Sequence, residues 1–406
     1  MHRRGMLAGL GLAVLGGSAA RAAENGSPWL SPMQPSGTRA GAKLVRLPGK
    51  QPLIQLSERP PNYEAPIETF RNAVTPNDEF FVRYHLAGIP DMDGLAKWSL
   101  SIGGDAAQRS LHFASLAELR NGFPEHEVTA VCQCSGNRRG LSDPHVAGVE
   151  WGYGAMGSAV WRGVRLKDVL AKAGIKSGAV EIWIHGMDGP VLPTTPAFHK
   201  SLPLDKATTD EVLIAYAMNG TALPHYNGYP VRLVVPGWTA TYWMKHLSAI
   251  EISSKPQPSF WMQKAYRVPA GMFPVDTAFA SQNDAKSWPI TEMVVNSVIA
   301  DPIDGAQVPA AGFTVHGMAW DRGHGIRSVE ISIDGGRTWH LARLDKEHGH
   351  FAFRAFSFST GKLPPGPCTI AARATSKAGE TQAEKLKWNP AGYHNNVPQT
   401  LTVTVA

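Results

Sequence analysis

The chain has 406 residues, of which 43% are hydrophobic and 18% are charged, and its formal net charge is +6. This length is enough for two or three domains with sizeable cores, and the composition is that of a globular protein and excludes a disordered one. The charge is far below that of a typical nucleic-acid binder, so we expect no DNA or RNA partner.

The first 23 residues have the features of an export leader. Arg3 and Arg4 precede an apolar, glycine-rich run from Met6 to Ala20, and small residues follow where a signal peptidase would cut. The apolar run is too short to span a bilayer. Paired arginines before such a run favour the twin-arginine (Tat) route over an ordinary Sec signal. We therefore expect a periplasmic protein without a membrane span.

A mixed α/β domain is expected over residues 24–286. Its first part, residues 24–75, is rich in Pro, Gly and Ser and predicts an irregular arm. Short apolar runs that stop at a glycine or turn residue predict strands: EVTAVCQ (127–133), AVEIWIHG (179–186) and VRLVVPG (231–237). Apolar residues at helical spacing before Gly174 predict a helix over 164–175.

The pattern changes after about residue 287, where a series of short strands begins. In IRSVEISIDGG, Val329, Ile331 and Ile333 share one face, and Asp334 with the two glycines after it supplies the turn. Comparable runs continue to the end of the chain. Residues 287–406 are therefore expected to form an antiparallel, immunoglobulin-like β-sandwich with one solvated face.

Two of the three cysteines stand one residue apart in VTAVCQCSGNRRG, residues 128–140. Cys132 is interpreted as a small buried residue of the strand. Cys134 leaves that strand, and Gly136 is expected to let the chain turn. Arg138 and Arg139 follow, and their positive charge favours a thiolate, the form that ligates a soft metal or attacks an electrophile.

The residues alone leave these two chemistries open. A cysteine hydrolase or transferase needs a histidine base, and several are available: His85, His145, His185, His199 and His225. A metal site with one thiolate needs its other ligands from elsewhere, and no zinc, iron–sulfur or c-type haem signature occurs. Four histidines are otherwise interpreted as surface or packing residues: His145, His199, His225 and His246.

The motif CSGNRRG resembles the molybdenum-ligand motif of the sulfite oxidase family, in which one cysteine binds molybdenum and a pterin dithiolene supplies the other sulfurs. Further blocks fall in the family's order from about residue 60 to the end: FFVRYHLAGIP (80–90), GVEWG (148–152), VLIAYAMNG (212–220), NGYPVRLVVPG (227–237), WMKHL (243–247), FWMQKAYRV (260–268) and SVEISIDGGRTW (328–339). The resemblance implies an α+β protein, in which a molybdopterin-binding domain is followed by an immunoglobulin-like β-sandwich of the dimerisation type.

The same resemblance implies roles for individual residues. Cys134 becomes the metal ligand. The oxyanion pocket is expected to be formed by Arg83, His85, Arg139, Trp151 and Tyr266. Molybdopterin is expected to be held by Phe81, Val82, Arg83, Tyr84, His85, Cys134, Asp188, Asn227, Arg232, Trp243, Met244 and Lys245. From its position alone, Arg232 also fits a solvated strand edge, and Asp188 also fits a turn with Gly189.

The resemblance implies a sulfite dehydrogenase that oxidises sulfite to sulfate at a molybdenum–molybdopterin centre. No haem domain is recognised in this chain, so the electrons are expected to pass to a c-type cytochrome or a separate haem subunit. The family also allows for a homodimer through the C-terminal domain. The alternative is a related molybdenum oxidoreductase acting on another oxyanion, a sulfoxide or carrier-bound sulfur. A cofactor-free binding module is a third class, but it leaves Cys134 and its arginines unexplained.

Three positions depart from the vertebrate pattern. Tyr84 stands where those enzymes have Asn, Asn227 where they have His, and Ala391 where an additional pocket arginine is expected. The anion pocket is therefore expected to carry less positive charge than in the vertebrate enzymes.

Overall fold

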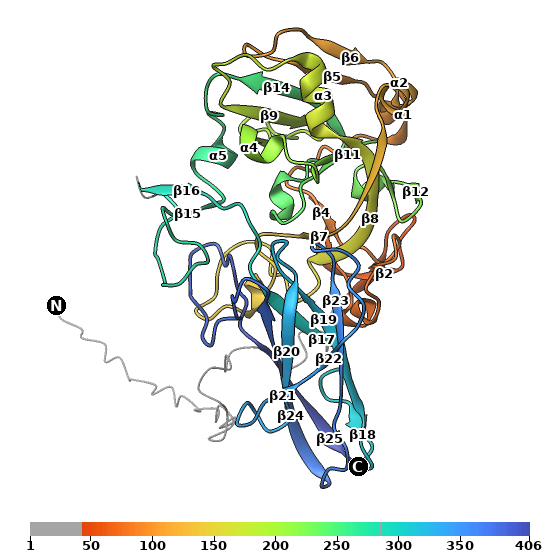
Figure 1. The fold of residues 1–406 in the computed structure, drawn as a ribbon, viewed down its shortest axis with the longest axis vertical. Helices are drawn as coiled ribbons and strands as arrows, with labels where there is room; N and C mark the ends of the chain where they lie inside the picture. Colours follow the sequence, from red (N-terminus) through yellow and green to blue (C-terminus); the bar gives the residue numbers. More distant parts are fainter. Residues whose placement is uncertain (1–42, 284–285) are drawn as a thin grey trace, which may run out of the picture.

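The computed structural model describes residues 43–283 and 286–406, so the expected export leader lies outside the described residues. Figure 1 shows an α/β body stacked on a β-sandwich along the long axis of the molecule. This arrangement confirms the fold class expected from the sequence. Within the described part of the chain, no helix is long and apolar enough to cross a membrane.

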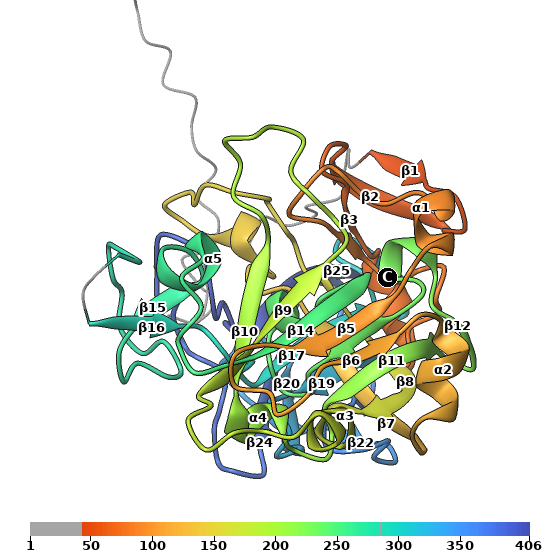
Figure 2. The same cartoon turned by 90° about the horizontal axis from the view of Figure 1, so that it is seen from above.

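The α/β body contains three sheets, and Figure 2 looks down onto the second of them. The first sheet has the order β1-β2-β3-β4, formed by β1 (Leu44–Arg46), β2 (Pro52–Ser57), β3 (Asn62–Glu64) and β4 (Val82–Arg83). The second has the order β10-β9-β14-β5-β6, formed by β5 (Leu100–Gly103), β6 (Leu111–Phe113), β9 (Glu181–Gly186), β10 (His199–Pro203) and β14 (Leu247–Ser253). The third has the order β12-β11-β8-β7 with β13 paired to β11, formed by β7 (Glu125–Gln133), β8 (Met156–Arg165), β11 (Leu213–Met218), β12 (Thr221–Ala222) and β13 (Arg232–Val234).

Short helices and one two-stranded ribbon complete this body. The α-helices are α1 (Met92–Ala96), α2 (Leu116–Asn121), α3 (Leu166–Ala173), α4 (Leu204–Ala207) and α5 (Phe260–Gln263). The 3-10 turns are η1 (Ile67–Arg71), η2 (Arg139–Leu141), η3 (His225–Asn227) and η4 (Ala240–Tyr242). The ribbon pairs β15 (Arg267–Pro269) with β16 (Ser287–Pro289).

The predicted helix and strands of this body are confirmed, with small shifts at their ends. Helix α3 buries the apolar residues that the spacing placed on one face, which are Leu166, Val169, Leu170 and Ala173. It ends at Gly174, whose φ is +73°. A side chain is strained in that left-handed conformation, which explains why a glycine ends the helix. Strands β9 and β13 lie within the runs predicted from their apolar content, and β7 covers its predicted run and begins two residues earlier, at Glu125.

The prediction of an irregular arm is wrong for the part of it that the structure describes. Residues 44–64 form three strands, and β4 completes their sheet. Leu53 and Tyr63 are buried there and pack with Val82 and Tyr84 in a small separate core. The strands are only three to six residues long and are separated by Pro- and Gly-containing turns, so their composition resembled that of a loop.

Two sheets form the C-terminal sandwich. One has the order β17-β19-β23-β22 and the other β18-β25-β24-β20-β21. Their strands are β17 (Asn296–Asp301), β18 (Gln307–Val308), β19 (Thr314–Trp320), β20 (Ile326–Ser332), β21 (His340–Leu341), β22 (Arg343–Leu344), β23 (Arg354–Ser359), β24 (Gly366–Ser376) and β25 (Gln399–Val405). The predicted turn is present, because Asp334 Oδ1 accepts hydrogen bonds from the N–H groups of Arg337 and Thr338, each at 2.9 Å. Ser332 alternates with Ile331 and Ile333 and was therefore expected on the solvated face of the strand. It is instead fully buried and accepts a hydrogen bond from the Gly336 N–H.

A shared hydrophobic core joins the two bodies. Phe70 of the α/β body packs edge-on against Phe353 of the sandwich, with ring centroids 5.9 Å apart. Trp320 lies in the same cluster, and its indole N–H donates a hydrogen bond of 2.6 Å to the Gln133 side chain. Gln133 ends β7 and directly precedes Cys134. The sandwich therefore touches the segment that carries the predicted metal ligand.

Candidate active site

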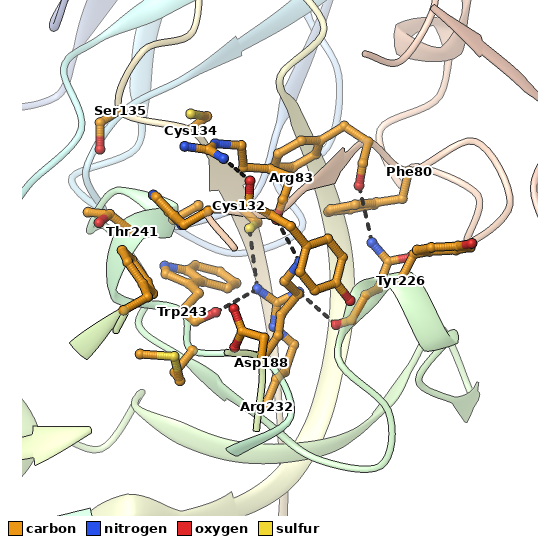
Figure 3. Close-up of a pocket in the computed structure, with 18 of the residues that line it drawn as sticks. Phe80, Arg83, Cys132, Cys134, Ser135, Asp188, Tyr226, Arg232, Thr241 and Trp243 are labelled. Atoms are coloured by element: carbon orange, nitrogen blue, oxygen red, sulfur yellow. Dashed lines mark hydrogen bonds between the residues drawn. The ribbon is translucent and has the colours of Figure 1, made fainter. Parts of the chain in front are cut away.

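One pocket in the α/β body gathers most of the predicted site residues (Figure 3). The predicted residues that line it are Phe81, Arg83, Tyr84, His85, Cys134, Asp188, Asn227, Arg232, Trp243, Met244, Lys245 and Tyr266. They come from β4, from the end of β7 and from the chain between residues 188 and 266. The sequence motifs therefore converge in space although they are far apart along the chain.

Cys134 stands one residue beyond the end of β7, as predicted. Its N–H donates to the Ala155 carbonyl at 2.9 Å, and the Asn137 side-chain oxygen accepts from the Ala155 N–H at 3.0 Å. Gly136 lies in the turn, as expected, and the turn is closed by a hydrogen bond of 3.0 Å from the Asn137 N–H to the Cys134 carbonyl. Arg138 is the left-handed residue of the loop, with a φ of +71°. The missing side chain of Gly136 also makes room for the guanidinium of Arg139.

Arg138 ties this loop to the sandwich. Its side chain is fully buried, its Nη1 donates to the Val397 carbonyl at 2.7 Å, and its Nη2 donates to the Ser297 carbonyl. The guanidinium also lies 4.9 Å from the centre of the Tyr153 ring. Burial lowers the pKa of Arg138 to about 10, and Tyr153 opposes that shift. Arg138 is thus a structural link between the two bodies.

Arg83, His85 and Tyr266 meet at one side of the pocket. The Tyr266 hydroxyl makes a short hydrogen bond with His85 Nε2 and lies 3.5 Å from Arg83 Nη2. Burial, together with the charges of Arg83 and Lys245, lowers the pKa of His85 well below its usual value, so the ring is neutral near pH 7. Burial raises the pKa of Tyr266, against the charge of Arg83. Tyr266 also has a left-handed φ of +59°, a strained conformation of the kind found at functional sites.

Arg232 lies inside the pocket, so the alternative interpretation as a solvated strand edge is wrong. It is 4% exposed and donates to the carbonyls of Asn227 and Trp243, at 2.9 and 3.1 Å. Its Nη2 also lies 3.8 Å from the Cys132 sulfur. Cys132 is buried as expected, but it also lines the pocket, and Figure 3 shows it between Cys134 and the Arg232 guanidinium. Burial raises the pKa of Cys132 to about 11, against the effect of Arg232.

Lys245 and Asp188 both line this side of the pocket and influence each other electrostatically. Lys245 donates to the Arg83 carbonyl at 2.6 Å, and its ammonium lies against the Tyr84 ring. Burial lowers the pKa of Lys245 well below its usual value, and Asp188 opposes the shift. Burial raises the pKa of Asp188, and Lys245 opposes it in turn. Asp188 therefore faces the pocket, beyond any role in a turn.

Three predicted residues do not line the pocket. Val82 points away from Arg83 along β4 and packs in the small N-terminal core. Trp151 is fully buried beside Phe81, with ring centroids 6.4 Å apart. Arg139 lies behind the metal loop, where its Nε donates to the Ala391 carbonyl at 2.6 Å.

The sequence did not assign several of the pocket residues to the site: Phe80, Cys132, Ser135, Phe198, Tyr226, Ala240 and Thr241. Two buried lysines next to the pocket were missed as well. Lys50 donates to Asn227 Oδ1 at 2.5 Å and to the Phe80 carbonyl at 3.0 Å. Lys200 lies with its ammonium 5.3 Å from the centre of the Tyr266 ring. Nothing in the sequence around either lysine marks it as buried, because polar residues, prolines or glycines surround both positions.

The histidines interpreted as surface or packing residues occupy such positions. His145 is largely exposed beside Glu150, and the His199 ring packs against His185. His225 hydrogen-bonds to the Pro90 carbonyl, and His246 is fully buried between the Tyr84 hydroxyl and the Tyr229 carbonyl. Across the described residues, no three His, Cys, Asp or Glu side chains cluster as a metal site.

The pocket residues fit molybdopterin. Several polar atoms around the pocket are buried without a hydrogen-bond partner in the protein: Arg83 Nε, Arg232 Nε, Trp151 Nε1, Ser135 Oγ and Thr241 Oγ1. A buried donor left unpaired costs on the order of 1–3 kcal/mol. An oxygen-rich anion such as a pterin phosphate satisfies donors of this kind. The single Cys134 thiol matches a metal that brings its other sulfur ligands with the pterin.

Comparison with known proteins agrees with this geometry. The model of the oxidoreductase molybdopterin binding domain matches residues 86–261, and that of the Mo-co oxidoreductase dimerisation domain matches residues 287–405. Mitochondrial sulfite oxidase of Macaca fascicularis is 36% identical over 377 residues, which cover 88% of this chain and 67% of that protein. Sulfite oxidase of Arabidopsis thaliana is 31% identical over 385 residues, which cover 88% of this chain and 96% of that protein.

The alignments span 55–67% of the length of the vertebrate relatives. Among solved structures, the sulfane dehydrogenase SoxCD from Paracoccus pantotrophus superposes with a TM-score of 0.71 at 25% identity. That superposition covers 90% of this chain and 90% of the other. The similarity therefore includes both the α/β body and the sandwich.

Proposed function

The chain belongs to the sulfite oxidase family of molybdopterin oxidoreductases, and we propose that it oxidises sulfite to sulfate. The observation that carries this proposal is the convergence of the Cys134 thiol, the Arg83 guanidinium and the Tyr266–His85 pair on one pocket with unpaired buried donors. Sulfite and sulfate are compact anions, and a guanidinium offers them several fixed donors. The similarity to sulfite oxidases supports the same substrate.

In this proposal, Cys134 ligates the molybdenum, while Arg232, Lys245 and Asn227 hold the pterin and its phosphate. When bound, the molybdenum–pterin group supplies the oxygen-transfer and two-electron chemistry. Arg232 and Lys245 suit the phosphate because both are cationic and face the same pocket. Lys50 keeps the Asn227 side chain in place through its 2.5 Å hydrogen bond.

The remaining pocket residues bind the anion and handle protons. Each sulfite takes one oxygen from water and gives up two electrons, and two protons are released. Tyr266 stays protonated because burial raises its pKa, so its hydroxyl donates to an oxyanion. His85 is neutral because burial lowers its pKa, and it positions the Tyr266 hydroxyl through the hydrogen bond between that hydroxyl and its Nε2. Arg83 provides the positive charge that holds the anion.

A sulfane dehydrogenase is the second candidate. The superposition on SoxCD covers 90% of both chains, and 25% identity is low enough for the substrates to differ. A reduced sulfur atom attached to a carrier would have to enter the same pocket. Parallel assays with sulfite and with a persulfide-bearing peptide separate the two candidates.

The location and partners follow from the same proposal. The twin-arginine leader supports export to the periplasm after the cofactor has been inserted. A c-type cytochrome, or a haem subunit, would accept the electrons there. The match of residues 287–405 to a dimerisation domain supports a homodimer through the sandwich.

Steady-state oxidation of sulfite by the purified full-length protein, with cytochrome c as acceptor, tests this proposal. Molybdenum and pterin contents are measured on the same preparation. We expect sulfite-dependent reduction of cytochrome c in proportion to molybdenum content. A molybdenum-loaded protein that is inactive with sulfite and active with the persulfide peptide would contradict sulfite oxidation and support the second candidate, a sulfane dehydrogenase.

A further inference from the structure

Part of the sandwich returns to the metal loop. We call residues 388–396, which precede β25, the closing segment. The Ala391 carbonyl accepts a hydrogen bond of 2.6 Å from Arg139 Nε, and the Asn395 side chain donates to the Arg138 carbonyl at 3.1 Å. Both arginines that follow the predicted metal ligand therefore contact this one segment.

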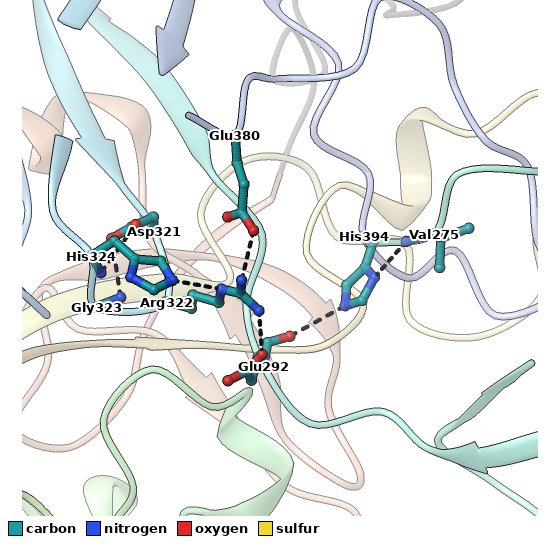
Figure 4. A network of polar contacts seen from close by, with 8 residues as sticks. All are labelled: Val275, Glu292, Asp321, Arg322, Gly323, His324, Glu380 and His394. Carbon is teal, nitrogen blue, oxygen red and sulfur yellow. Dashed lines mark hydrogen bonds and ion pairs between the residues drawn. The ribbon is translucent and has the colours of Figure 1, made fainter. Parts of the chain in front are cut away.

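The closing segment is itself firmly held. Asn389 clamps Tyr393 by accepting from its N–H and donating to its carbonyl, each at 2.9 Å. His394 accepts a hydrogen bond from the Val275 N–H and bonds through Nε2 to the Glu292 carbonyl (Figure 4). Burial lowers the pKa of His394 to about 4, so this ring stays neutral and keeps both bonds near pH 7.

Arg322 fixes the same region from the other side. Figure 4 shows its guanidinium between Glu292 and Glu380, with N–O distances of 2.6 and 2.7 Å. Glu292 thus connects the arginine with His394 of the closing segment. These residues all lie in the sandwich, and the hydrogen bond from the Val275 N–H to His394 links the segment to the α/β body.

Tyr393 brings an aromatic ring from the closing segment to the active site. It is 4% exposed, and its ring lies nearly parallel to that of Tyr266, with centroids 5.8 Å apart and an angle of 18°. The Arg139 guanidinium carbon lies 6.0 Å from the centre of the Tyr393 ring. A cation at that distance from an aromatic face is attracted to it.

Glycines leave Arg139 little space to move. A Cβ on Gly136 would lie 2.4 Å from Arg139 Nη2, and one on Gly148 would lie 2.8 Å from its Nη1. A Cβ on Gly392, in the closing segment, would lie 2.7 Å from Arg139 Cγ. The guanidinium is therefore packed against three backbone segments, with Nη2 directed at the loop that carries Cys134.

We propose that Tyr393 is a positioning residue of the anion pocket, which holds the Tyr266 ring at the pocket and the Arg139 guanidinium behind the metal loop, and so keeps Tyr266 in the orientation that binds the oxyanion. The proposal rests on the proposed function of the same site. Docking of the sandwich then controls substrate affinity.

The test compares Tyr393→Leu, which removes the ring, with Tyr393→Phe, which keeps it, in the full-length, molybdenum-loaded protein. Isothermal titration measures the dissociation constant of sulfate, and steady-state kinetics measures KM and kcat for sulfite. For Tyr393→Leu we expect sulfate affinity to fall by about three- to tenfold, the range for loss of a partly buried cation–π contact. KM should rise by a similar factor while kcat changes less, and Tyr393→Phe should recover most of the loss.

Phe356→Leu is the matched control, since Phe356 is a fully buried aromatic residue of the sandwich core. It lowers stability without changing sulfate affinity. In an Arg139→Gln background, Tyr393→Leu should have little further effect. Equal sulfate affinity in wild type and Tyr393→Leu, or an equal loss in Phe356→Leu, overturns the inference while sulfite activity stands. A wild type that binds sulfate but does not oxidise sulfite overturns the proposed function and leaves the inference intact.

Discussion

The two ends of the pocket are built in different ways. At the Arg232 end, Arg232 and Lys245 donate to backbone carbonyls that all belong to the α/β body. At the other end, which we call the Arg139 end, Tyr266 stacks on Tyr393, and Arg139 donates to the Ala391 carbonyl from behind the metal loop, so the sandwich takes part. Under the proposed function, cofactor binding depends on the fold of one body, whereas anion binding depends on how two bodies dock.

The largest expected effect concerns Cys134, which lies between the two ends. Cys134→Ser replaces the proposed metal ligand with a poorer one, so sulfite oxidation should fall by more than about a hundredfold, the upper end of losses for residues that only orient a ligand. Activity and molybdenum content are measured together. Cys368→Ala is the matched control, because that thiol is buried in the sandwich core. A Cys134→Ser protein with full activity and full molybdenum content would show that the ligand is elsewhere.

A change at the Arg232 end should act on the cofactor alone. Arg232→Met removes a buried guanidinium that faces the proposed phosphate position, so bound pterin and molybdenum should fall by about tenfold or more. The residual activity per molybdenum and the KM for sulfite should stay close to wild type. Pterin fluorescence after denaturation and metal analysis measure the contents. A normal cofactor content with a raised KM would reverse the assignment of the two ends.

Changes at the Arg139 end should act on the anion. A charge-assisted hydrogen bond contributes about 1.5–3 kcal/mol, so Arg83→Gln should raise KM for sulfite by roughly tenfold to a hundredfold. Arg139→Gln should raise KM less, because Arg139 lies behind the metal loop and does not line the pocket. Molybdenum content should be unchanged, in contrast to Arg232→Met. Steady-state kinetics at matched metal loading measures the effect. Unchanged KM values in both variants would mean that the anion binds elsewhere.

The sequence predicted the Arg232 end better than the Arg139 end. Cys134, Arg232 and Lys245 lie in motifs that a family resemblance recognises, and that resemblance implied a common site for them. Tyr393 carries no such signal, because its role comes from a ring contact across 127 positions of the chain. Lys50 was missed for a similar reason, since it lies in the arm that composition predicted to be irregular.

The sequence also did not predict the backbone conformation of Arg138 or the side-chain position of Arg139. Arg138 was predicted only as a charge near Cys134, but its left-handed backbone and its bonds to the sandwich make it a structural link. Arg139 was predicted to line the pocket, yet it reaches the site from behind a glycine. Both outcomes depend on the docking of the sandwich, which no local pattern encodes.

The smallest expected effect concerns stability and tests the charge state of Lys200, a buried lysine beside Tyr266. Lys200 donates to the Trp261 carbonyl at 2.9 Å, and its ammonium lies over the rings of Tyr242 and Tyr266. Burial lowers its pKa from 10.5 to about 7, with Arg267 adding to the shift and Glu181 opposing it. Between pH 7 and 10.5 the unfolded chain thus holds a proton that the folded protein lacks, and stability rises with pH.

Replacing Lys200 with Met removes this contribution. Between pH 7 and 9, the free energy of unfolding should rise by up to about 2–3 kcal/mol more in the wild type than in Lys200→Met. One pH unit corresponds to about 1.4 kcal/mol per proton. For a chain of this size that is a difference of several degrees in Tm, measured by thermal unfolding at both pH values. Lys362→Met, at an exposed position, is the matched control and should follow the wild type. If Lys200→Met and wild type gain stability equally between these pH values, Lys200 keeps its proton in the folded protein. A permanent positive charge then lies behind Tyr266, and it strengthens anion binding at the Arg139 end.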